Sequence, residues 1–223
     1  MNKIKFIVFL LRDFPKSVFF NFIVFPFAIA IKMPVRIRYN VKLGKLRKNS
    51  VQLNCVPKYF MVKLGFQGAG FVSANHSSFS VLKDGCIIFS GECVIAEGFN
   101  IFIDNGVVTI GEGFYSNRNF ELQCEREISI GQDVLLGWNV SVRDTDGHKT
   151  YFNGIENNDR ECVVVNNHVW IASHCTILKG THLSQGSIVG CNSLVCGVKM
   201  EQPNCLLAGV PARVKKQGIT WKE

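Results

Sequence analysis

The sequence lacks an apolar run long enough to cross a bilayer. A membrane-spanning helix needs about 20 predominantly apolar residues, whereas the stretch from 18 to 31 has only 14 residues and contains Asn21 and Pro26. A first apolar stretch at 6–11 is followed at once by charged residues and a proline, without a clear small-residue cleavage site. We therefore expect neither a transmembrane helix nor a cleaved signal peptide, and we predict a cytoplasmic location.

The sequence also lacks cysteines at the close spacing of a CxxC motif. The chain has nine cysteines but no CxxC pair, so neither a redox motif nor a cysteine-based metal site is indicated. Cys175, Cys191 and Cys196 stand at positions where a small residue is expected in the repeat described below. We interpret them as reduced thiols that fill space.

Acidic residues are almost absent from the first 48 positions. This segment holds eleven Lys and Arg against the single acid Asp13, and it is rich in phenylalanine between 19 and 27. Basic residues together with aromatics suggest contact with an anionic membrane surface. The alternative, that these phenylalanines cover the end or side of a folded core, remains open. Nucleic-acid binding is disfavoured because the patch is strongly apolar rather than a charged groove.

What the chain does have is a period of six. An aliphatic residue returns at every sixth position between 165 and 195: Val165, Ile171, Ile177, Leu183, Val189 and Val195. No helix or ordinary strand has this period. A chain wound into a triangular coil, with one short strand on each face, turns every sixth side chain inward. The pattern predicts an all-β fold, a parallel β-helix with three six-residue units per turn.

An earlier run, Ile130, Leu136 and Val142, keeps the same spacing and belongs to the same predicted coil. Between the two runs, polar and turn-forming residues break the register at 145–162. We expect an excursion loop there, and such insertions commonly lie on the working face of a repeat fold. The predicted organisation is a basic aromatic N-terminal extension at 1–50, the β-helix with its excursion loop at 51–200, and a C-terminal tail at 201–223 that is expected to contribute to cofactor binding.

Three segments carry a resemblance to a known family: VSVRDTDGH at 140–148, VWIASHCTILKG at 169–180 and LLAGVPARV at 206–214. They resemble the hexapeptide-repeat O-acetyltransferases over about residues 85–221. FNFIVFPFAIAIKMP at 20–34 and GITW at 218–221 look like the branch that acetylates sugars of bacterial surface polysaccharides. Galactoside and maltose acetyltransferases are more distant. The resemblance implies a left-handed coil, a homotrimer with active sites between protomers, and acetyl-CoA as acyl donor.

In that family the catalytic base is a histidine just before the excursion loop, and His148 stands at that place. A neutral imidazole, with a pKa near about 6.5, can take the proton of a sugar hydroxyl as the oxygen attacks a thioester. Asp146 and Asp144 lie two and four residues earlier, so on an extended strand either carboxylate could orient the imidazole. Asp146 is the first choice. The alternative is that the aspartates form the turn into the loop.

The resemblance also implies roles for residues on neighbouring coils. Asn117 is expected to contact the acceptor, and the backbone N–H of Ser173 to stabilise the developing oxyanion. The expected contacts to acetyl-CoA are Trp170 as a wall, Ala172 and Cys191 beside the pantetheine arm, and Lys199, Arg213 and Lys216 as basic contacts, the last two near the phosphates. The alternatives are a corner asparagine, a packed tryptophan and a solvated basic tail.

Taken together, the sequence predicts an acetyl-CoA-dependent O-acetyltransferase. The acceptor is a sugar hydroxyl in bacterial surface polysaccharide, such as capsule, O-antigen or exopolysaccharide, reached near the inner face of the cytoplasmic membrane. Two alternatives stay open: a non-catalytic β-helix that binds at the membrane, and an N-acetyltransferase for an amino sugar. No metal is expected, because the spacings of His168, His174 and His182 do not suit a three-histidine zinc site.

Overall fold

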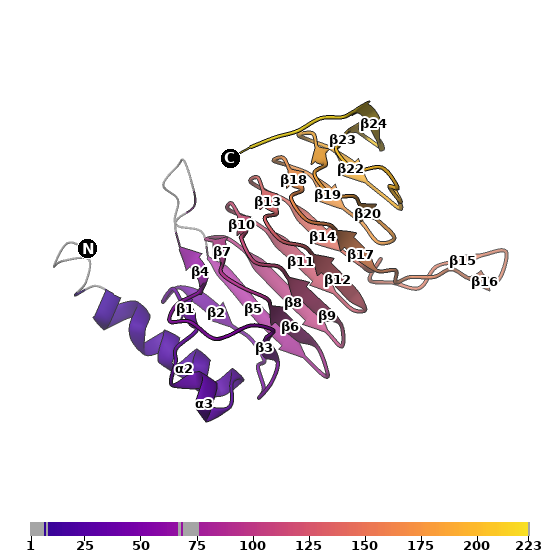
Figure 1. Cartoon of the computed structure of the whole chain (residues 1–223). Helices are drawn as coiled ribbons and strands as arrows, with labels where there is room; N and C mark the ends of the chain where they lie inside the picture. The colour runs from indigo at the N-terminus through magenta and orange to yellow at the C-terminus, as the bar shows by residue number, and fades with distance from the viewer. Residues whose placement is uncertain (1–6, 8, 67, 69–75, 223) are drawn as a thin grey trace.

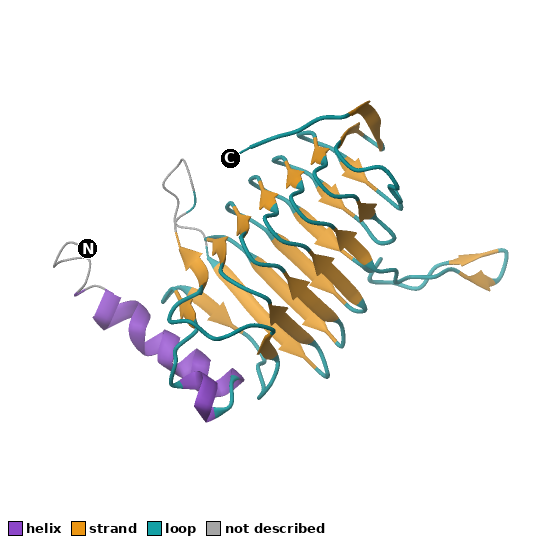
Figure 2. Ribbon diagram, in the orientation of Figure 1, coloured by secondary structure: helices purple, strands orange, loops and turns teal. Residues whose placement is uncertain are grey.

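The structure, a computed structural model, describes Ile7, residues 9–66, Gly68 and residues 76–222. Three sheets of short strands form the faces of a triangular prism, and the chain passes from one face to the next as it winds (Figure 1, Figure 2). Pairing between strands of neighbouring coils is parallel throughout the prism, except that the last strand folds back antiparallel. The predicted parallel β-helix is therefore confirmed.

Each face is one sheet. The first sheet runs in the order β1 (Val35–Ile37), β4 (Val62–Phe66), β7 (Cys93–Ala96), β10 (Phe114–Ser116), β13 (Leu135–Leu136), β18 (Trp170–Ile171), β21 (Ile188–Val189), β23 (Cys205–Gly209) and β24 (Ala212–Gln217). The second sheet runs β2 (Val41–Leu43), β5 (Ser77–Leu82), β8 (Asn100–Asp104), β11 (Glu121–Cys124), β14 (Ser141–Arg143), β19 (Thr176–Ile177) and β22 (Leu194–Val195). The third sheet runs β3 (Val51–Leu53), β6 (Cys86–Phe89), β9 (Val107–Ile110), β12 (Glu127–Ile130), β17 (Val163–Val165) and β20 (His182–Leu183).

The aliphatic residues of the six-residue period fill the inside of the prism. In the third sheet Ile130 pairs with Val165, which pairs with Leu183, and the other two sheets repeat this ladder with their own members of the series. Every one of these side chains is at most 2% exposed. Because burial of such a side chain contributes about 1.5–3 kcal/mol, the stacked ladder is the main source of stability.

The coil begins earlier in the chain than the boundary predicted at residue 51. Strand β1 pairs with β4, and β2 pairs with β5, both in parallel register. The coil also continues beyond residue 200, since β23 pairs in parallel with β21. The first coils were missed because their strands are separated by irregular loops, which hide the six-residue spacing.

A helical segment covers the N-terminal end of the first sheet. It consists of η1 (Phe9–Asp13) and α2 (Phe14–Val24), followed by α3 (Phe27–Ala30). The Asn21 side chain donates to the carbonyl of Val35 at 2.7 Å and accepts from its N–H at 3.1 Å. Ser17 bonds both backbone groups of Ile37 in the same way. Side chains of the helix thus protect the edge strand β1, which would otherwise offer unpaired backbone groups.

The same helix contributes to the core from one side only. Phe20 is fully buried and meets the ring of Phe79 edge-on, with 5.6 Å between ring centroids. Phe25 is also buried, whereas Phe19, Phe22 and Phe27 are exposed. The alternative that these phenylalanines cover the folded core is therefore confirmed for Phe20 and Phe25, whereas Phe19, Phe22 and Phe27 do not contribute to the core. No helix among the described residues is long and apolar enough to span a membrane.

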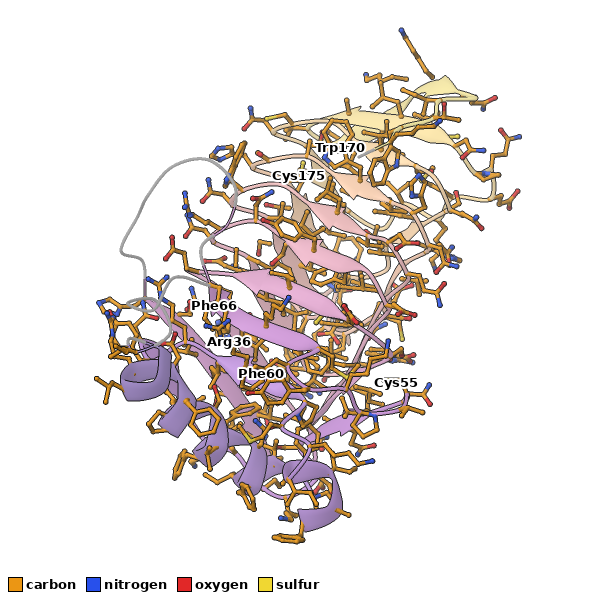
Figure 3. The ribbon with its side chains drawn as sticks, turned by 60° about the vertical axis from the view of Figure 1, so that its left-hand side comes forward. Arg36, Cys55, Phe60, Phe66, Trp170 and Cys175 are labelled. Carbon is orange, nitrogen blue, oxygen red and sulfur yellow. The ribbon has the colours of Figure 1, made fainter. Side chains whose placement is uncertain are left out.

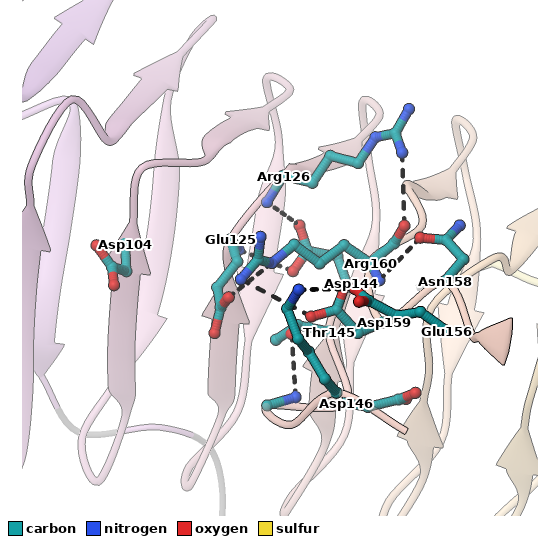
Figure 4. A network of polar contacts seen from close by, with 12 residues as sticks. Asp104, Glu125, Arg126, Asp144, Thr145, Asp146, Glu156, Asn158, Asp159 and Arg160 are labelled. Carbon is teal, nitrogen blue, oxygen red and sulfur yellow. Dashed lines mark hydrogen bonds and ion pairs between the residues drawn. The ribbon is translucent and has the colours of Figure 1, made fainter. Parts of the chain in front are cut away.

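Between β14 and β17 the chain leaves the coil as a hairpin, β15 (Tyr151–Phe152) and β16 (Ile155–Glu156), which projects away from the prism (Figure 1). Its foot is held by polar contacts (Figure 4). Thr145 forms an isolated bridge with Arg160, and the Arg160 guanidinium donates to Glu125 at 2.8 Å. The foot thereby fixes where residues 146–148 emerge from the coil.

Candidate active site

A groove on the outside of the first sheet brings together five of the residues predicted for the site: Asn117, Trp170, Ala172, Ser173 and Cys191. Its volume is about 600 Å³. The other lining residues come from the same corner of successive coils and from the C-terminal tail: Leu135, Gly137, Trp138, Ile188, Gly190, Leu206 and Ile219. These residues lie far apart in the chain but are stacked by the winding of the coil.

Asn117 is held rigidly at one end of the groove. Its amide nitrogen donates to the carbonyl of Leu136 at 3.3 Å. The next residue, Arg118, is buried and pairs with Glu97 at 3.0 Å, and Glu97 also pairs with Arg38 at 2.6 Å. The Oδ1 atom of Asn117 is buried and has no hydrogen-bond partner among the described residues. A buried acceptor without a donor is costly, so it is a natural place for a ligand hydroxyl.

Ser173 stands at the corner between the first and second sheets. Its hydroxyl accepts the N–H of Trp138 at 3.0 Å. The N–H groups of Ala172 and His174, on either side of it, donate to carbonyls of Val189 and Trp138. The N–H of Ser173 itself donates to no backbone carbonyl in the described part of the chain. This N–H is a donor in the wall that can reach an oxygen bound in the groove.

Small residues form the floor of the groove. Gly137, Ala172, Gly190 and Cys191 follow one another along the corner of three coils. A Cβ added at Gly190 would lie 3.1 Å from the Cβ of Ala208, a tight contact. A narrow, largely apolar channel of this kind fits a thin, flexible chain such as the pantetheine arm of an acyl-CoA. Cys191 stands where a smaller residue is expected in the repeat, and its side chain lines the channel without closing it.

Two of the three predicted basic contacts lie beside the groove. In the antiparallel pair of β23 with β24, Lys216 is opposite Leu206, and Arg213 is opposite Ala208. Directly opposed residues in a sheet share a face, and Leu206 lines the groove. The two cations are therefore on the face that carries the groove. Lys199 lies elsewhere, because its amine pairs with Glu161 at 2.8 Å, at the base of the excursion.

His148 does not line this groove. It is exposed and follows β14 of the second sheet, three residues after Thr145 at the foot of the excursion. Asp146, the first choice for orienting it, pairs with Lys179 at 2.5 Å. Of the described residues that line the groove, Cys191 alone has an ionisable side chain. The described lining of the groove therefore contains no histidine or carboxylate that could act as a general base.

Asp144 has a different role from the predicted one. It is fully buried, and its carboxylate accepts backbone N–H groups from Glu125 at 2.8 Å and from Arg126 and Glu127 at 2.7 Å (Figure 4). Burial, and then the nearby carboxylate, raise the pKa of Cys124, whose protonated thiol donates to Asp144 at 3.2 Å. With both oxygens occupied, Asp144 is not available to orient His148; it caps backbone amides of the preceding coil at 125–127 rather than those of the turn into the excursion loop.

Sequence reasoning gave the tail at 201–223 a part in cofactor binding but assigned no individual role to the residues at 218–221. Its Trp221 stacks on the imidazole of His168, with 4.2 Å between ring centroids, and donates Nε1–H to the His168 carbonyl at 3.1 Å. Trp221 also lies 6.1 Å from Trp170, centroid to centroid, and Ile219 lines the groove. The tail thus forms one wall of the site. The GITW motif was a signal for this, but its sequence alone does not show where the tail packs.

Metal binding has no support in the described residues, where no three His, Cys, Asp or Glu side chains come together in an arrangement that could hold an ion. A comparison with models of protein families found none that matches the chain. Individual proteins do match. Galactoside O-acetyltransferase of Escherichia coli K12 is 33% identical over 49% of this chain and 54% of its own length, so the chain spans about half of that relative.

A second relative covers more of the chain. It is an uncharacterised 24.8 kDa protein from the cps region of Klebsiella pneumoniae, 30% identical over 82% of this chain and 77% of its own length. Among solved structures, a hexapeptide-repeat acetyltransferase of Vibrio cholerae, in complex with acetyl coenzyme A, is similar in fold. Its TM-score is 0.50 at 21% identity, over 59% of this chain and 70% of the other.

The chain belongs to the hexapeptide-repeat acyltransferases. The coil is accordingly left-handed, as the resemblance implied. The segments at 20–34 and 218–221 resemble the branch of this family that contains bacterial polysaccharide O-acetyltransferases.

The positions of Lys216 and Lys199 give a matched pair of variants. Lys216→Ser removes a cation from the groove face, and we expect the KM for acetyl-CoA to rise about three- to tenfold, as for a partly exposed charge-assisted contact. Lys199→Ser removes a cation from the base of the excursion, and the KM should not change. Initial rates at varied acetyl-CoA concentration measure both. Equal effects of the two variants would argue against a phosphate contact by Lys216.

Proposed function

We propose that this protein transfers an acetyl group from acetyl-CoA to a hydroxyl group of a sugar during the biosynthesis of bacterial surface polysaccharide. The groove carries this proposal, because it combines a narrow channel of small residues with two groups placed to bind oxygen. These are the Oδ1 of Asn117 and the N–H of Ser173, for which the described part of the chain offers no partner. The K12 galactoside O-acetyltransferase, to which the chain is similar, is named for the same type of acceptor.

Each group has a defined task in a direct transfer. Bound acetyl-CoA supplies a thioester carbonyl that can be attacked. His148 removes the proton of the sugar hydroxyl as its oxygen bonds to the carbonyl carbon, while the Ser173 N–H donates to the carbonyl oxygen as negative charge develops there. Asn117 holds the acceptor. When the C–S bond breaks, the proton on His148 passes to the departing thiolate, so no acyl-enzyme is needed.

The site is completed by a second copy of the chain in a homotrimer. His148 is exposed on one side of the prism, whereas the groove that lacks a base lies at another corner. A neighbouring protomer can bring its His148 to the groove, and a ring of three such contacts uses every groove and every histidine. Asp146 is our candidate for orienting the imidazole, once the neighbour has displaced or joined its contact with Lys179.

The acceptor and the location form part of the same proposal. Acetyl-CoA is made in the cytoplasm, so we place the reaction there, at the inner face of the cytoplasmic membrane, where polysaccharide units are assembled on lipid carriers. The basic and aromatic residues between 1 and 48 support peripheral contact with that membrane.

The type of bond formed tests the proposed function. Purified protein is incubated with acetyl-CoA and a panel of saccharides that includes both neutral and amino sugars. The expected product is an acetyl ester, which mild base hydrolyses to acetate and the original hydroxyl. It should not form with acceptors that lack a free hydroxyl. A base-stable amide formed only with amino sugars would instead show an N-acetyltransferase, and no acetyl transfer to any saccharide would favour the non-catalytic alternative.

A further inference from the structure

The outer side of the N-terminal helical segment carries a continuous apolar stripe, made of Leu11, Phe19, Phe22, Phe27 and Ile31. These side chains are between 42% and 75% exposed, although each is large and apolar. Within α2, Phe19 and Phe22 are three residues apart and so lie on one face, and the ring of Phe22 meets that of Phe27 with 6.0 Å between centroids. The opposite face, with Ser17, Phe20 and Asn21, is the one that packs on the coil. The stripe therefore points away from the prism.

Positive charge borders the stripe. Arg12, Lys32 and Lys48 are exposed next to it, and Lys48 reaches the carbonyl of Phe22 at 3.3 Å. Asp13, the single acid among the first 48 residues, is buried and accepts the N–H of Tyr39 at 3.1 Å. The described surface of this segment thus presents cations and aromatic rings without an exposed carboxylate.

We propose that this stripe lies in the interface of an anionic phospholipid bilayer, so that the enzyme binds the membrane by the N-terminal end of its coil. Aromatic side chains favour the headgroup region, and a helix that presents such a face beside basic residues binds in the plane of the membrane. Each Lys or Arg near an anionic surface strengthens binding by about fivefold.

A second copy of the chain fits this surface poorly. If two such ends met, the cations around one stripe would face the cations around the other, and the helical segment itself offers no exposed acid to relieve the repulsion. A bilayer with anionic lipids supplies the missing negative charge. Charge therefore distinguishes between the two occupants, although an apolar face alone would suit both.

The orientation sets the height of the groove above the lipid. Four strands of the first sheet lie between β1 and β18, so at about 4.8 Å per strand Trp170 lies roughly 24 Å from β1 along the coil. Figure 3 shows Trp170 and Cys175 on coils far from the helix. In combination with the proposed function, on which this step rests, the acetylated sugar would be one held away from the headgroups rather than the unit attached to the lipid.

Vesicle binding by the full chain tests the inference without using its activity, so failure here is distinct from failure of the proposed function. The fraction of protein that sediments with vesicles is measured for two compositions. One contains equal parts of phosphatidylglycerol and phosphatidylcholine, and the other contains phosphatidylcholine alone. We expect Phe27→Glu to lower partition to the anionic vesicles by at least tenfold. The control is Phe152→Glu on the hairpin, because Phe27 and Phe152 are both 70% exposed; this variant should bind normally.

Unchanged partition of Phe27→Glu, or an equal loss with Phe152→Glu, would overturn the inference. So would a change in the oligomeric state of Phe27→Glu without vesicles, which would show that another protomer covers the stripe.

The native tryptophans provide a second readout. The chain has three, namely Trp138, Trp170 and Trp221, and all belong to the groove or its tail. Brominated lipids, which quench nearby tryptophans, should leave the emission of the vesicle-bound protein unchanged, whereas Phe27→Trp should add a component that is quenched. Quenching of the native tryptophans would mean that the groove, and not the stripe, contacts the bilayer.

Discussion

His148→Ala is expected to lower kcat for acetyl transfer by about a hundred- to ten-thousand-fold, because the hydroxyl then has no base to receive its proton. The side chain is exposed, so the variant should fold normally and its KM for acetyl-CoA should change little. Steady-state kinetics, together with a thermal melt of both proteins, measure the effect. A variant that retains activity within a few fold would show that another group is the base.

Co-expression of two inactive variants distinguishes a shared site from one built within a single chain. His148→Ala retains a normal groove, and Ala172→Trp fills the groove but retains His148. If each site takes its histidine from one protomer and its groove from the next, random mixing restores about a quarter of the native activity. Within a single chain no mixed site can form, so activity would remain absent.

Asp144→Asn is expected to lower the free energy of unfolding by about 3–5 kcal/mol. The carboxylate accepts three backbone N–H groups and one thiol in a fully buried corner. The amide of asparagine has one acceptor oxygen and directs an NH2 group at donors, so at least one buried N–H loses its partner. Urea unfolding followed by circular dichroism gives the difference.

Asp146→Asn is the matched control, since it makes the same change two residues later. Its carboxylate is 41% exposed in a pair with Lys179, so the free energy of unfolding should change by no more than about 0.5 kcal/mol. Equal stability of the two variants would contradict the structural role of Asp144.

The core of the coil was predictable because each six-residue unit forms one face of the coil, so that every sixth side chain points inward. Ile171, for example, lies between Leu136 and Val189 in one ladder, as its position in the series requires. The coils around Val35 and Val41 were not predictable in this way, because their loops vary in length. The hydrogen bonds from Asn21 to the edge of β1 depend on where the helix packs, which no local pattern encodes.

The site was predictable only in part, for a similar reason. A resemblance identified Asn117 and Ser173, and the winding of the coil brings both to one groove. The DTDG stretch is compatible with either a turn or an orienting carboxylate, whereas the buried N–H groups around Asp144 show that it caps the preceding coil instead. Lys199 and Lys216 look alike in sequence, but the antiparallel return of β24 places only Lys216 on the groove face.

Acetylation of surface polysaccharide in living cells tests the central claim most directly. The O-acetyl content of that polysaccharide is measured by mass spectrometry in host cells that carry either the intact protein or His148→Ala at matched expression. The proposed function predicts that one specific, base-labile acetyl group is present with the intact protein and lost with the variant. Identical O-acetyl content in the two strains would contradict it.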